Sequence, residues 1–215
     1  MILPANKIFV FDLDDTLYSE SDFEKSGIKF VYDYLKIDTI DLDSVLNCRK
    51  NWIEQIVLKS NNFFTKDSIL ELYRLHKPQI ELYNSAKILL EKLITLKVEM
   101  SLITDGRSIT QRNKLIALGI ESYFKNIIIS EEIKSEKPSE VNFRMVMDDD
   151  QKNEYVYLAD NTQKDFITPN KLGWTTICLL DNGRNIHKQN FKLSNEYLPQ
   201  FTINSFEEII LTNEY

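Results

Sequence analysis

Short apolar runs alternate with amphipathic segments along most of this chain. The runs that predict strands are residues 8–11, 98–103, 126–130, 155–159 and 174–180, with 201–203 as a weaker sixth. Four consecutive apolar residues, as in Ile8-Phe9-Val10-Phe11, are typical of a strand that is buried on both faces of a parallel sheet. The alternation predicts an α/β fold, a doubly wound, Rossmann-like parallel sheet with helices on both faces.

Several helices of this pattern carry local start and stop signals. Asn84 is a candidate cap for the helix that the apolar residues of 86–96 mark. Residues 108–111 have the form of a capping box, and Gly119 is a natural helix stop. Another helix is expected just after Pro138. These signals place helices between the predicted strands.

The last third of the chain gives weaker signals. Thr162 precedes Asp165 by three residues, a spacing typical of a helix cap, and Pro169 is expected to restart that helix. Residues 181–199 are polar and irregular, which predicts a long surface loop, and residues 206–211 predict a closing helix.

One long stretch interrupts the alternation of strands and helices. Residues 19–83 contain no convincing strand, and their apolar residues recur at helical spacing in three regions, 23–35, 42–57 and 69–75. We therefore expect two parts. Residues 1–18 and 84–215 form the Rossmann-like core, and residues 19–83 form a small all-helical cap domain inserted into it.

Composition limits the kind of protein. The chain has 215 residues, is 43% hydrophobic and 27% charged, and has a net charge of −7. This negative charge argues against a nucleic-acid or anionic-membrane partner. Its two cysteines indicate no disulfide framework, and neither a signal peptide nor a run of about 18 apolar residues is visible. We therefore expect a soluble, cytoplasmic protein, whose oligomeric state the sequence leaves open.

Polar residues with chemical potential follow the predicted strands. They are Asp12 and Asp14 after the first, Thr104 after the second, Lys137 between the third and fourth, and Asp160 with Asp165 after the fourth. An Asp-rich turn is the ordinary explanation for any one of these acids. The carboxyl ends of parallel strands meet in one crevice, however, so we expect these groups to converge.

The converging groups fit phosphoryl transfer. Carboxylate oxygens without His or Cys are ligands that Mg²⁺ prefers. An Asp is ionised at neutral pH and can act as a nucleophile that forms an aspartyl-phosphate. The repulsion between this carboxylate and an anionic phosphoryl group is relieved by a metal ion and by Lys137.

Four motifs in order, FDLDDTL, LITDG, EKPS and LADNTQKD, resemble those of the haloacid dehalogenase superfamily, specifically its phosphatase branch with a helical cap after the first motif. The resemblance covers the whole predicted core. It implies that Asp12 is the nucleophile and that Asp14 is the general acid and base. It also implies that Thr104 holds the phosphoryl group and that Lys137 balances its charge.

The same resemblance implies the remaining site residues. The metal ligands are Asp12, Asp14 through its backbone carbonyl, Asp160 and Asp165, the last directly or through water. The substrate-binding residues are Thr104, Asp105, Gly106, Arg107 and Lys137, with the backbone amide near Leu13. For Arg107 two interpretations stay open, a phosphate or substrate contact and a plain helix-start residue.

The chain departs from the family pattern at two places. Ala159 stands where many relatives have glycine before the metal-binding Asp, and TDG replaces the TNG that relatives often have. We expect the first change to be tolerated and the second, through Asp105, to alter the charge near the phosphate.

The function that follows is a Mg²⁺-dependent phosphomonoesterase that hydrolyses a small phosphorylated metabolite through an aspartyl-phosphate. Asp14 favours a phosphatase over a dehalogenase, because only an ester has an alkoxide leaving group to protonate. We expect its substrate to be a sugar phosphate, a nucleotide or a phospho-acid. The alternatives are a phosphomutase or phosphotransferase on sugar phosphates, and a non-catalytic binding protein that retains the fold.

The helical segment supplies candidate contacts to the substrate's leaving group: Arg49, Lys50, Trp52, Arg74, His76 and Lys77. Each has a plainer interpretation. The basic residues are more often on solvated helix faces, and Trp52 is more simply part of the segment's own core. We expect no catalytic role for His76, and we expect His187 to lie on the surface.

Overall fold

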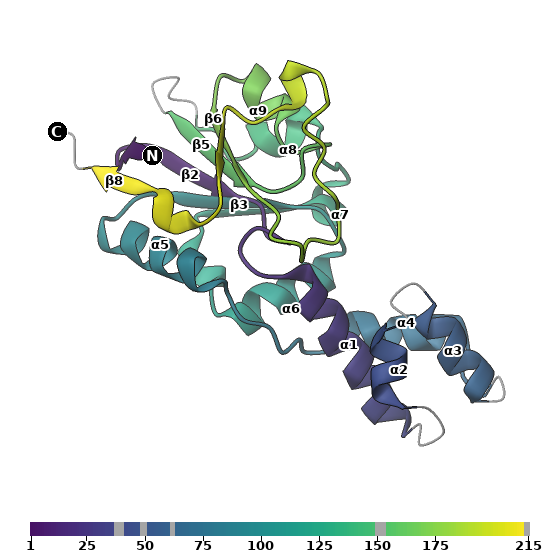
Figure 1. The fold of residues 1–215 in the computed structure, drawn as a ribbon. Coiled ribbons are helices and arrows are strands. Elements are labelled where there is room, and N and C mark those ends of the chain that lie inside the picture. The colour runs from purple at the N-terminus through teal and green to yellow at the C-terminus, as the bar shows by residue number, and fades with distance from the viewer. Residues whose placement is uncertain (37–40, 48–50, 61–62, 149–153, 213–215) are drawn as a thin grey trace.

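The computed structural model describes residues 1–36, 41–47, 51–60, 63–148 and 154–212. Within these residues a central six-stranded parallel sheet has the order β4-β3-β2-β5-β6-β7 (Figure 1). Its strands are β2 (Ile8–Phe11), β3 (Met100–Thr104), β4 (Asn126–Ile129), β5 (Tyr155–Ala159), β6 (Thr175–Leu179) and β7 (Phe201–Ile203). The predicted doubly wound parallel sheet is confirmed, with β2 at its centre.

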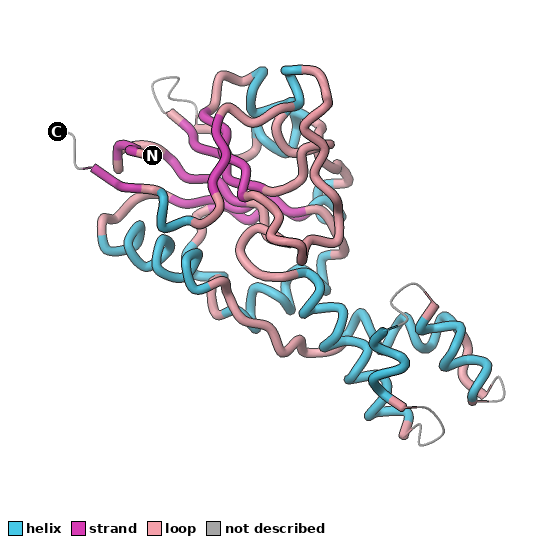
Figure 2. Tube along the Cα trace, in the orientation of Figure 1, coloured by secondary structure: helices cyan, strands magenta, loops and turns pink. Residues whose placement is uncertain are grey.

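Helices connect the strands and cover both faces of the sheet (Figures 1 and 2). They are α5 (Asn84–Thr95), α6 (Ser108–Leu118), α7 (Ser130–Ile133), α8 (Glu140–Arg144) and α9 (Ile167–Lys171), with 3₁₀ turns η1 (Glu121–Tyr123), η2 (Asn195–Tyr197) and η3 (Phe206–Glu208). Helices α5 and α6 lie on one face, and α8 and α9 lie on the other.

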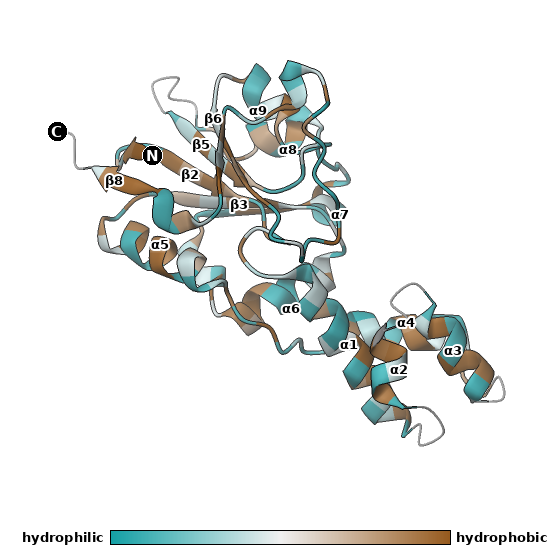
Figure 3. Cartoon of the chain, in the orientation of Figure 1, coloured by the Kyte–Doolittle hydropathy of each residue, from teal (hydrophilic) through white to brown (hydrophobic). Residues whose placement is uncertain are grey.

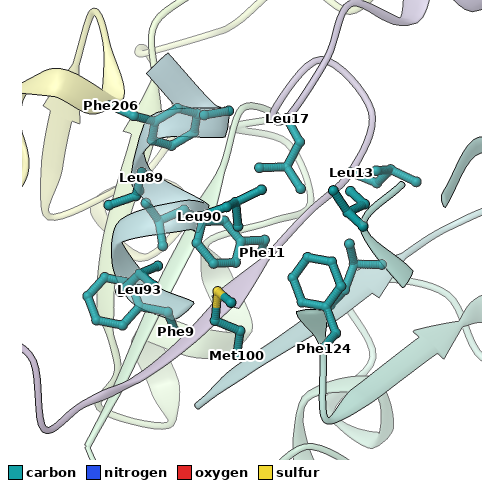
Figure 4. Close-up of a cluster of buried hydrophobic side chains, with 14 of the residues drawn as sticks. Phe9, Phe11, Leu13, Leu17, Leu89, Leu90, Leu93, Met100, Phe124 and Phe206 are labelled. Carbon is teal, nitrogen blue, oxygen red and sulfur yellow. The ribbon is translucent and has the colours of Figure 1, made fainter. Parts of the chain in front are cut away.

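Strand β2 shows why its sequence has no polar face. It is hydrophobic along its length (Figure 3), and successive side chains point to opposite sides of the sheet. Phe9 and Phe11 pack against the leucines of α5 (Figure 4), whereas Ile8 and Val10 join the opposite cluster, which contains Trp174. Burial of each such side chain contributes roughly 1.5–3 kcal/mol, so both helical layers stabilise this strand.

A second, two-stranded sheet pairs β1 (Ile2–Pro4) with β8 (Ile210–Thr212) in parallel. The closing helix predicted over 206–211 is therefore wrong, since only the turn η3 is helical there. Ile210 is exposed while Leu211 is buried, and Leu3 of β1 is buried beside it in the same cluster. This inside–outside alternation is a strand pattern, and a short apolar run does not distinguish it from a helix.

Two predicted helix starts differ from the structure. Asn84 is the first residue of α5, and Tyr83 occupies the N-cap position. At α6 the N-cap is Arg107 without a side-chain cap bond, so the predicted capping box of 108–111 does not form. Gly119, by contrast, ends α6 in the left-handed conformation (φ 69°), which confirms its predicted role.

The predicted cap at Thr162 does not form either. Its buried hydroxyl accepts a hydrogen bond from the Asn190 amide at 2.8 Å, across 28 residues of chain. Pro169 lies inside α9 rather than at a restart, and Phe166 is the N-cap residue of that helix. Thr162, which its spacing from Asp165 assigned to a helix cap, is therefore bonded to the loop that follows β6.

The described part of residues 19–75 is mainly helical, as predicted, and a non-helical stretch over 76–83 leads back to the sheet. The helices are α1 (Glu20–Leu35), α2 (Leu42–Asn47), α3 (Trp52–Lys59) and α4 (Lys66–Leu75), so the second predicted region is two helices. They bury an apolar cluster of their own, formed by Ile28, Val31, Val45, Trp52, Ile56 and Ile69. Helices α2–α4 extend away from the sheet (Figure 1). The boundaries of the two expected parts, at residues 18/19 and 83/84, stay a prediction.

The chain leaves and re-enters the sheet region at one place. Tyr18 and Leu82 form an antiparallel bridge, and the Tyr83 amide donates to the Leu17 carbonyl at 2.9 Å. The helices α1–α4 lie between these paired segments. None of the helices in the described part of the chain has the length and apolar content to cross a bilayer.

Gly27 sets how closely α1 and α4 pack. A Cβ atom at this buried position would overlap the Tyr73 ring and lie 3.0 Å from His76 Cε1. We therefore expect Gly27→Ala to lower the free energy of unfolding by about 1–3 kcal/mol through overpacking, although alanine normally stabilises a helix interior. Urea unfolding measures this change. Lys29→Ala, at an exposed position of α1, is the control. A Gly27→Ala protein more stable than the wild type would contradict this packing.

Candidate active site

The ends of β2, β3 and β5 open into one cavity of about 330 Å³. Its lining is almost entirely charged or polar: Asp12, Asp14, Asp15, Glu20, Asp105, Gly106, Glu136, Lys137, Asp160, Asn161, Lys164 and His187. The structure thus brings together side chains that are up to 175 positions apart, as the strand order predicts.

Lys137 joins two acids at the centre of the site. Its Nζ donates to Asp12 Oδ1 at 2.6 Å and lies 2.7 Å from Asp165 Oδ1, and its side chain is 1% exposed. Burial alone would lower the pKa of this ammonium, but Asp12 and Asp165 outweigh burial and hold it well above its usual value. Lys137 is therefore a permanent buried cation between two carboxylates.

Asp12 is a buried carboxylate at the carboxyl end of β2. Its backbone amide donates to the Leu158 carbonyl of β5 at 2.9 Å, and Thr16 Oγ1 donates to its Oδ2 at 3.1 Å. Burial raises its pKa to about 6, with a further contribution from Asp165 and opposition from Lys137. The side chain has a defined orientation, and its charge depends on nearby cations.

Three acids form a group that fits a divalent cation. Asp12, Asp160 and Asp165 are all buried, and one oxygen atom of each lies within 4.8 Å of the others. Burial and the charges of the other two acids raise the pKa of Asp160 well above its usual value. Carboxylates that repel one another in a buried site need a shared cation or proton, and hard oxygen ligands suit Mg²⁺.

Asp14 points into the same cavity but is held by a different set of residues. Lys114 Nζ donates to its Oδ1 at 2.7 Å, Gln111 Nε2 donates to its Oδ2 at 2.8 Å, and Tyr18 Oη donates to Oδ1. Burial raises the pKa of this carboxyl, but Lys114 and the two other donors lower it more, so that it lies below its usual value. Gln111 also donates to Thr104 Oγ1 at 2.6 Å, which links the ends of β2 and β3.

The loop after β3 also reaches the site. Both oxygens of Asp105 accept hydrogen bonds, from the Lys137 amide at 3.0 Å and from Lys164 Nζ at 2.7 Å. The Gly106 amide donates to Ser130 Oγ at 2.9 Å, and Gly106 has a φ of 140°. Asp105 therefore orients the lysine segment, and its place in the predicted substrate set stays a prediction.

Arg107 lies outside this cavity. It is exposed, it occupies the N-cap position of α6, and it lines a neighbouring hollow with Lys134 and Glu136. Of the two interpretations that were open for Arg107, the structure supports a residue at the start of a helix. A role in substrate binding stays a prediction.

The segment 181–199 is a surface loop, as predicted, and it also packs over the site. Asn185 Nδ2 donates to Asp160 Oδ2 at 2.8 Å, and Gln189 Nε2 donates to the Asp160 carbonyl at 2.8 Å. The amide of Ile186 donates to Asp15 Oδ2 at 2.7 Å. His187 is exposed, as predicted, but it lines the cavity. The polar composition of this loop supplies hydrogen-bond partners for the buried acids.

Asp15 connects this loop to the helical segment. It has a left-handed backbone (φ 54°), which Asp tolerates better than most residues. Its Oδ1 accepts from the Glu20 amide at 2.8 Å, and its Oδ2 accepts from Ile186. Glu20 lines the cavity, and burial together with the charge of Asp14 raises its pKa to about 8.

Two of the candidate contacts from the helical segment are buried there. Trp52 belongs to the apolar cluster, with its ring centroid 5.4 Å from that of Tyr73. His76 is 1% exposed, its Nδ1 lies 2.5 Å from the Tyr73 carbonyl oxygen, and its ring lies 4.9 Å from the Phe23 ring. Both are packing residues, which the plainer interpretation predicted for Trp52, whereas His76 is buried and not on a solvated helix face.

Arg74 and Lys77 do not reach the cavity in this structure. Both are absent from its lining among the described residues, and Lys77 is exposed. Arg49 and Lys50 lie outside the described residues. The structure therefore gives no support for a substrate contact by Arg74 or Lys77.

The sequence reasoning missed Tyr18, Gln111, Lys114 and Asn185. A glutamine and a lysine three residues apart on α6 lie on one helix face, which was a usable signal. Nothing local indicated that this face meets Asp14, about 100 positions earlier.

Comparison with known proteins agrees with this geometry. A model of the haloacid dehalogenase-like hydrolases matches residues 9–179. A glyceraldehyde 3-phosphate phosphatase of Methanocaldococcus jannaschii is 28% identical over 227 aligned residues, covering 95% of each chain. Among solved structures, the HAD hydrolase YfnB of Bacillus subtilis, bound to magnesium, aligns with a TM-score of 0.67 at 16% identity, covering 94% of this chain and 96% of that one. A phosphoglycolate phosphatase predicted in Haemophilus somnus 129PT aligns with a TM-score of 0.62 at 17% identity, covering 96% and 97%.

Proposed function

Because the chain belongs to the haloacid dehalogenase-like hydrolase family, we propose that it is a Mg²⁺-dependent phosphomonoesterase acting through an aspartyl-phosphate. One observation carries the proposal. A buried Asp12, paired with Lys137 at 2.6 Å, lines a polar cavity with Asp14 and Asp160, and the buried Asp165 lies beside Asp12 and Asp160. Such a site holds an anionic phosphoryl group only if cations offset its charge.

The first half of the reaction forms a bond from an Asp12 carboxylate oxygen to phosphorus, and the ester P–O bond breaks. The leaving alkoxide takes a proton from Asp14, which enters the cycle protonated and leaves this step as the carboxylate that pairs with Lys114. Thr104 and the backbone amides near Leu13 and Gly106 hold the phosphoryl oxygens, while Lys137 offsets their charge. A magnesium ion held by Asp12, Asp160, Asp165 and the Asp14 carbonyl would supply further charge stabilisation.

In the second half a water oxygen bonds to phosphorus, and the Asp12–phosphorus bond breaks. Asp14 takes the proton from that water, so one group serves as acid and then as base. The products are an alcohol and inorganic phosphate, and the enzyme returns to its starting state. Helices α1–α4, whose first residue Glu20 lines the cavity, would act as the cap that excludes bulk water.

The cavity supports a small polar substrate. Its volume is about 330 Å³, and among the described residues its lining has no aromatic side chain other than the His187 imidazole. A nucleobase would find only the exposed His187 imidazole to stack on among these lining residues. The name of the Methanocaldococcus relative makes glyceraldehyde 3-phosphate the first compound to test.

The decisive experiment measures phosphate release from p-nitrophenyl phosphate and from a panel of small phosphometabolites, with and without Mg²⁺. No turnover above that of Asp12→Asn would refute the proposal. Isomer formation from hexose phosphates without free phosphate would show a mutase instead. Failure of the folded protein to trap beryllofluoride at Asp12 with Mg²⁺ would favour the non-catalytic alternative.

Metal removal gives a separate prediction. Chelation with EDTA is expected to reduce the turnover of p-nitrophenyl phosphate by at least about 100-fold, because several kcal/mol of charge stabilisation is lost. Excess Mg²⁺ should restore it. Titration calorimetry should show Mg²⁺ binding that weakens strongly in Asp160→Asn. Full activity after exhaustive chelation would contradict a metal requirement.

A further inference from the structure

We infer that Lys114 is a positioning residue for Asp14, and that it couples the orientation of this carboxylate to the first helix of the helical segment. The inference rests on the proposed function, because it assigns a step to Asp14. Lys114 belongs to α6, outside the four motifs that define the site.

The contacts of Lys114 place it next to the reacting groups. Its Nζ lies 2.7 Å from Asp14 Oδ1, and the lysine is 3% exposed. Gln111, one turn earlier on α6, donates to the other carboxylate oxygen, and the Tyr18 hydroxyl also donates to Asp14. Donors on both oxygens fix the direction of the Asp14 side chain.

Lys114 also contacts the helical segment. Its Nζ lies 4.4 Å from the centroid of the Phe23 ring of α1, a distance typical of a cation–π interaction. Phe23 is 5% exposed and packs edge-on against Tyr73 of α4 at 5.6 Å between ring centroids. A displacement of α1 relative to α6 therefore changes the surroundings of the same ammonium that holds Asp14.

This geometry assigns Lys114 to the second half of the reaction. Once the alcohol has left, Asp14 is a carboxylate that must take a proton from water. The structure shows it paired as a carboxylate, with Lys114 as its cation. Loss of Lys114 removes this cation and leaves the orientation of Asp14 to Gln111 and Tyr18, so the carboxylate is held less firmly toward the water and breakdown of the aspartyl-phosphate slows.

The test uses Lys114→Met with p-nitrophenyl phosphate, whose good leaving group needs little help from an acid. We expect kcat to fall about tenfold while kcat/KM stays within about threefold, so that KM falls with kcat. Rapid mixing should show a burst of p-nitrophenol close to one equivalent per enzyme. In an Asp14→Asn background, Lys114→Met should have little further effect.

Two further variants complete the test. Arg112→Met removes another cation of α6, one that pairs with Glu132 at 3.0 Å, and it should leave kcat and KM unchanged. Phe23→Leu keeps both charged partners and removes only the ring, so it should give a smaller burst of the same kind. It also tests the inference if Lys114→Met fails to fold.

The outcomes separate the inference from the proposed function. Equal losses in kcat and kcat/KM, or no change in either, would overturn the role of Lys114 while leaving the phosphatase intact. A wild-type protein that releases no phosphate would instead overturn the proposed function.

Discussion

Replacing Asp12 with asparagine should abolish phosphate release, with a loss of about 10⁴-fold or more. Removal of a nucleophile has effects of this size, because the groups of a catalytic constellation act as a unit. Asparagine has nearly the same shape and can still accept from Lys137 and Thr16, but it forms no aspartyl-phosphate. Phosphate release from p-nitrophenyl phosphate with saturating Mg²⁺ measures the loss.

The melting temperature of Asp12→Asn distinguishes a loss of catalytic activity from misfolding. The wild-type site holds three mutually repelling buried acids, and burial already raises the pKa of Asp12 to about 6. Neutralising one of them should leave the melting temperature in the absence of metal unchanged or higher. Asp43→Asn, at an exposed position of α2, is the matched control and should keep full activity. Turnover by Asp12→Asn near the wild-type rate would exclude Asp12 as the nucleophile.

Replacing Lys137 with methionine should damage both activity and stability. The change removes the cation that lies within 2.7 Å of Asp12 and of Asp165 and leaves two buried carboxylates without it. Breaking such a buried pair costs about 3–5 kcal/mol of unfolding free energy. Activity should fall about 100-fold or more, because the phosphoryl group loses its fixed counter-charge. Urea unfolding and steady-state kinetics measure the two effects.

The stability loss in Lys137→Met should depend on pH in a defined direction. Without the lysine, the folded-state pKa of Asp12 rises further above its unfolded value. The folded protein then binds protons at a higher pH than the unfolded chain does. Stability therefore increases as the pH falls from 8 toward 5, so the deficit relative to the wild type shrinks. Lys171→Met, at an exposed position of α9, should show neither effect, and a deficit that grows on acidification would contradict the pairing.

The parts of the fold that could be predicted are those where a local sequence pattern is compatible with only one arrangement of strands and helices. Four consecutive apolar residues before Asp12 need cover on both sides, and that requirement gives a parallel sheet with its acids at one edge. Residues 206–211 carry no such constraint. Their strand pairs with Ile2–Pro4, about 200 positions away, and no local signal reports that partner.

The parts of the site that could not be predicted depend on distant partners. Lys114 has the sequence context of a solvated helix residue, yet it is buried because Asp14 lies beside it. Gln111 fits a capping box by spacing, but its amide contacts Asp14 and Thr104. In sequence, Asn185 does not differ from the many other polar residues of its loop, and only the fold shows that it bonds to Asp160. The expected cytoplasmic location stays a prediction.

The antiparallel bridge between Tyr18 and Leu82 has a consequence for the evolution of this chain. The two ends of the helical segment are already joined by this bridge. The sheet can therefore form whatever the length or the internal fold of the helical segment. Loop-closure entropy grows only slowly with the number of residues enclosed, so a longer, shorter or unrelated module can occupy the same slot at little thermodynamic cost. Substrate preference can therefore change when the whole helical segment is replaced, while the site residues at the ends of the strands stay the same.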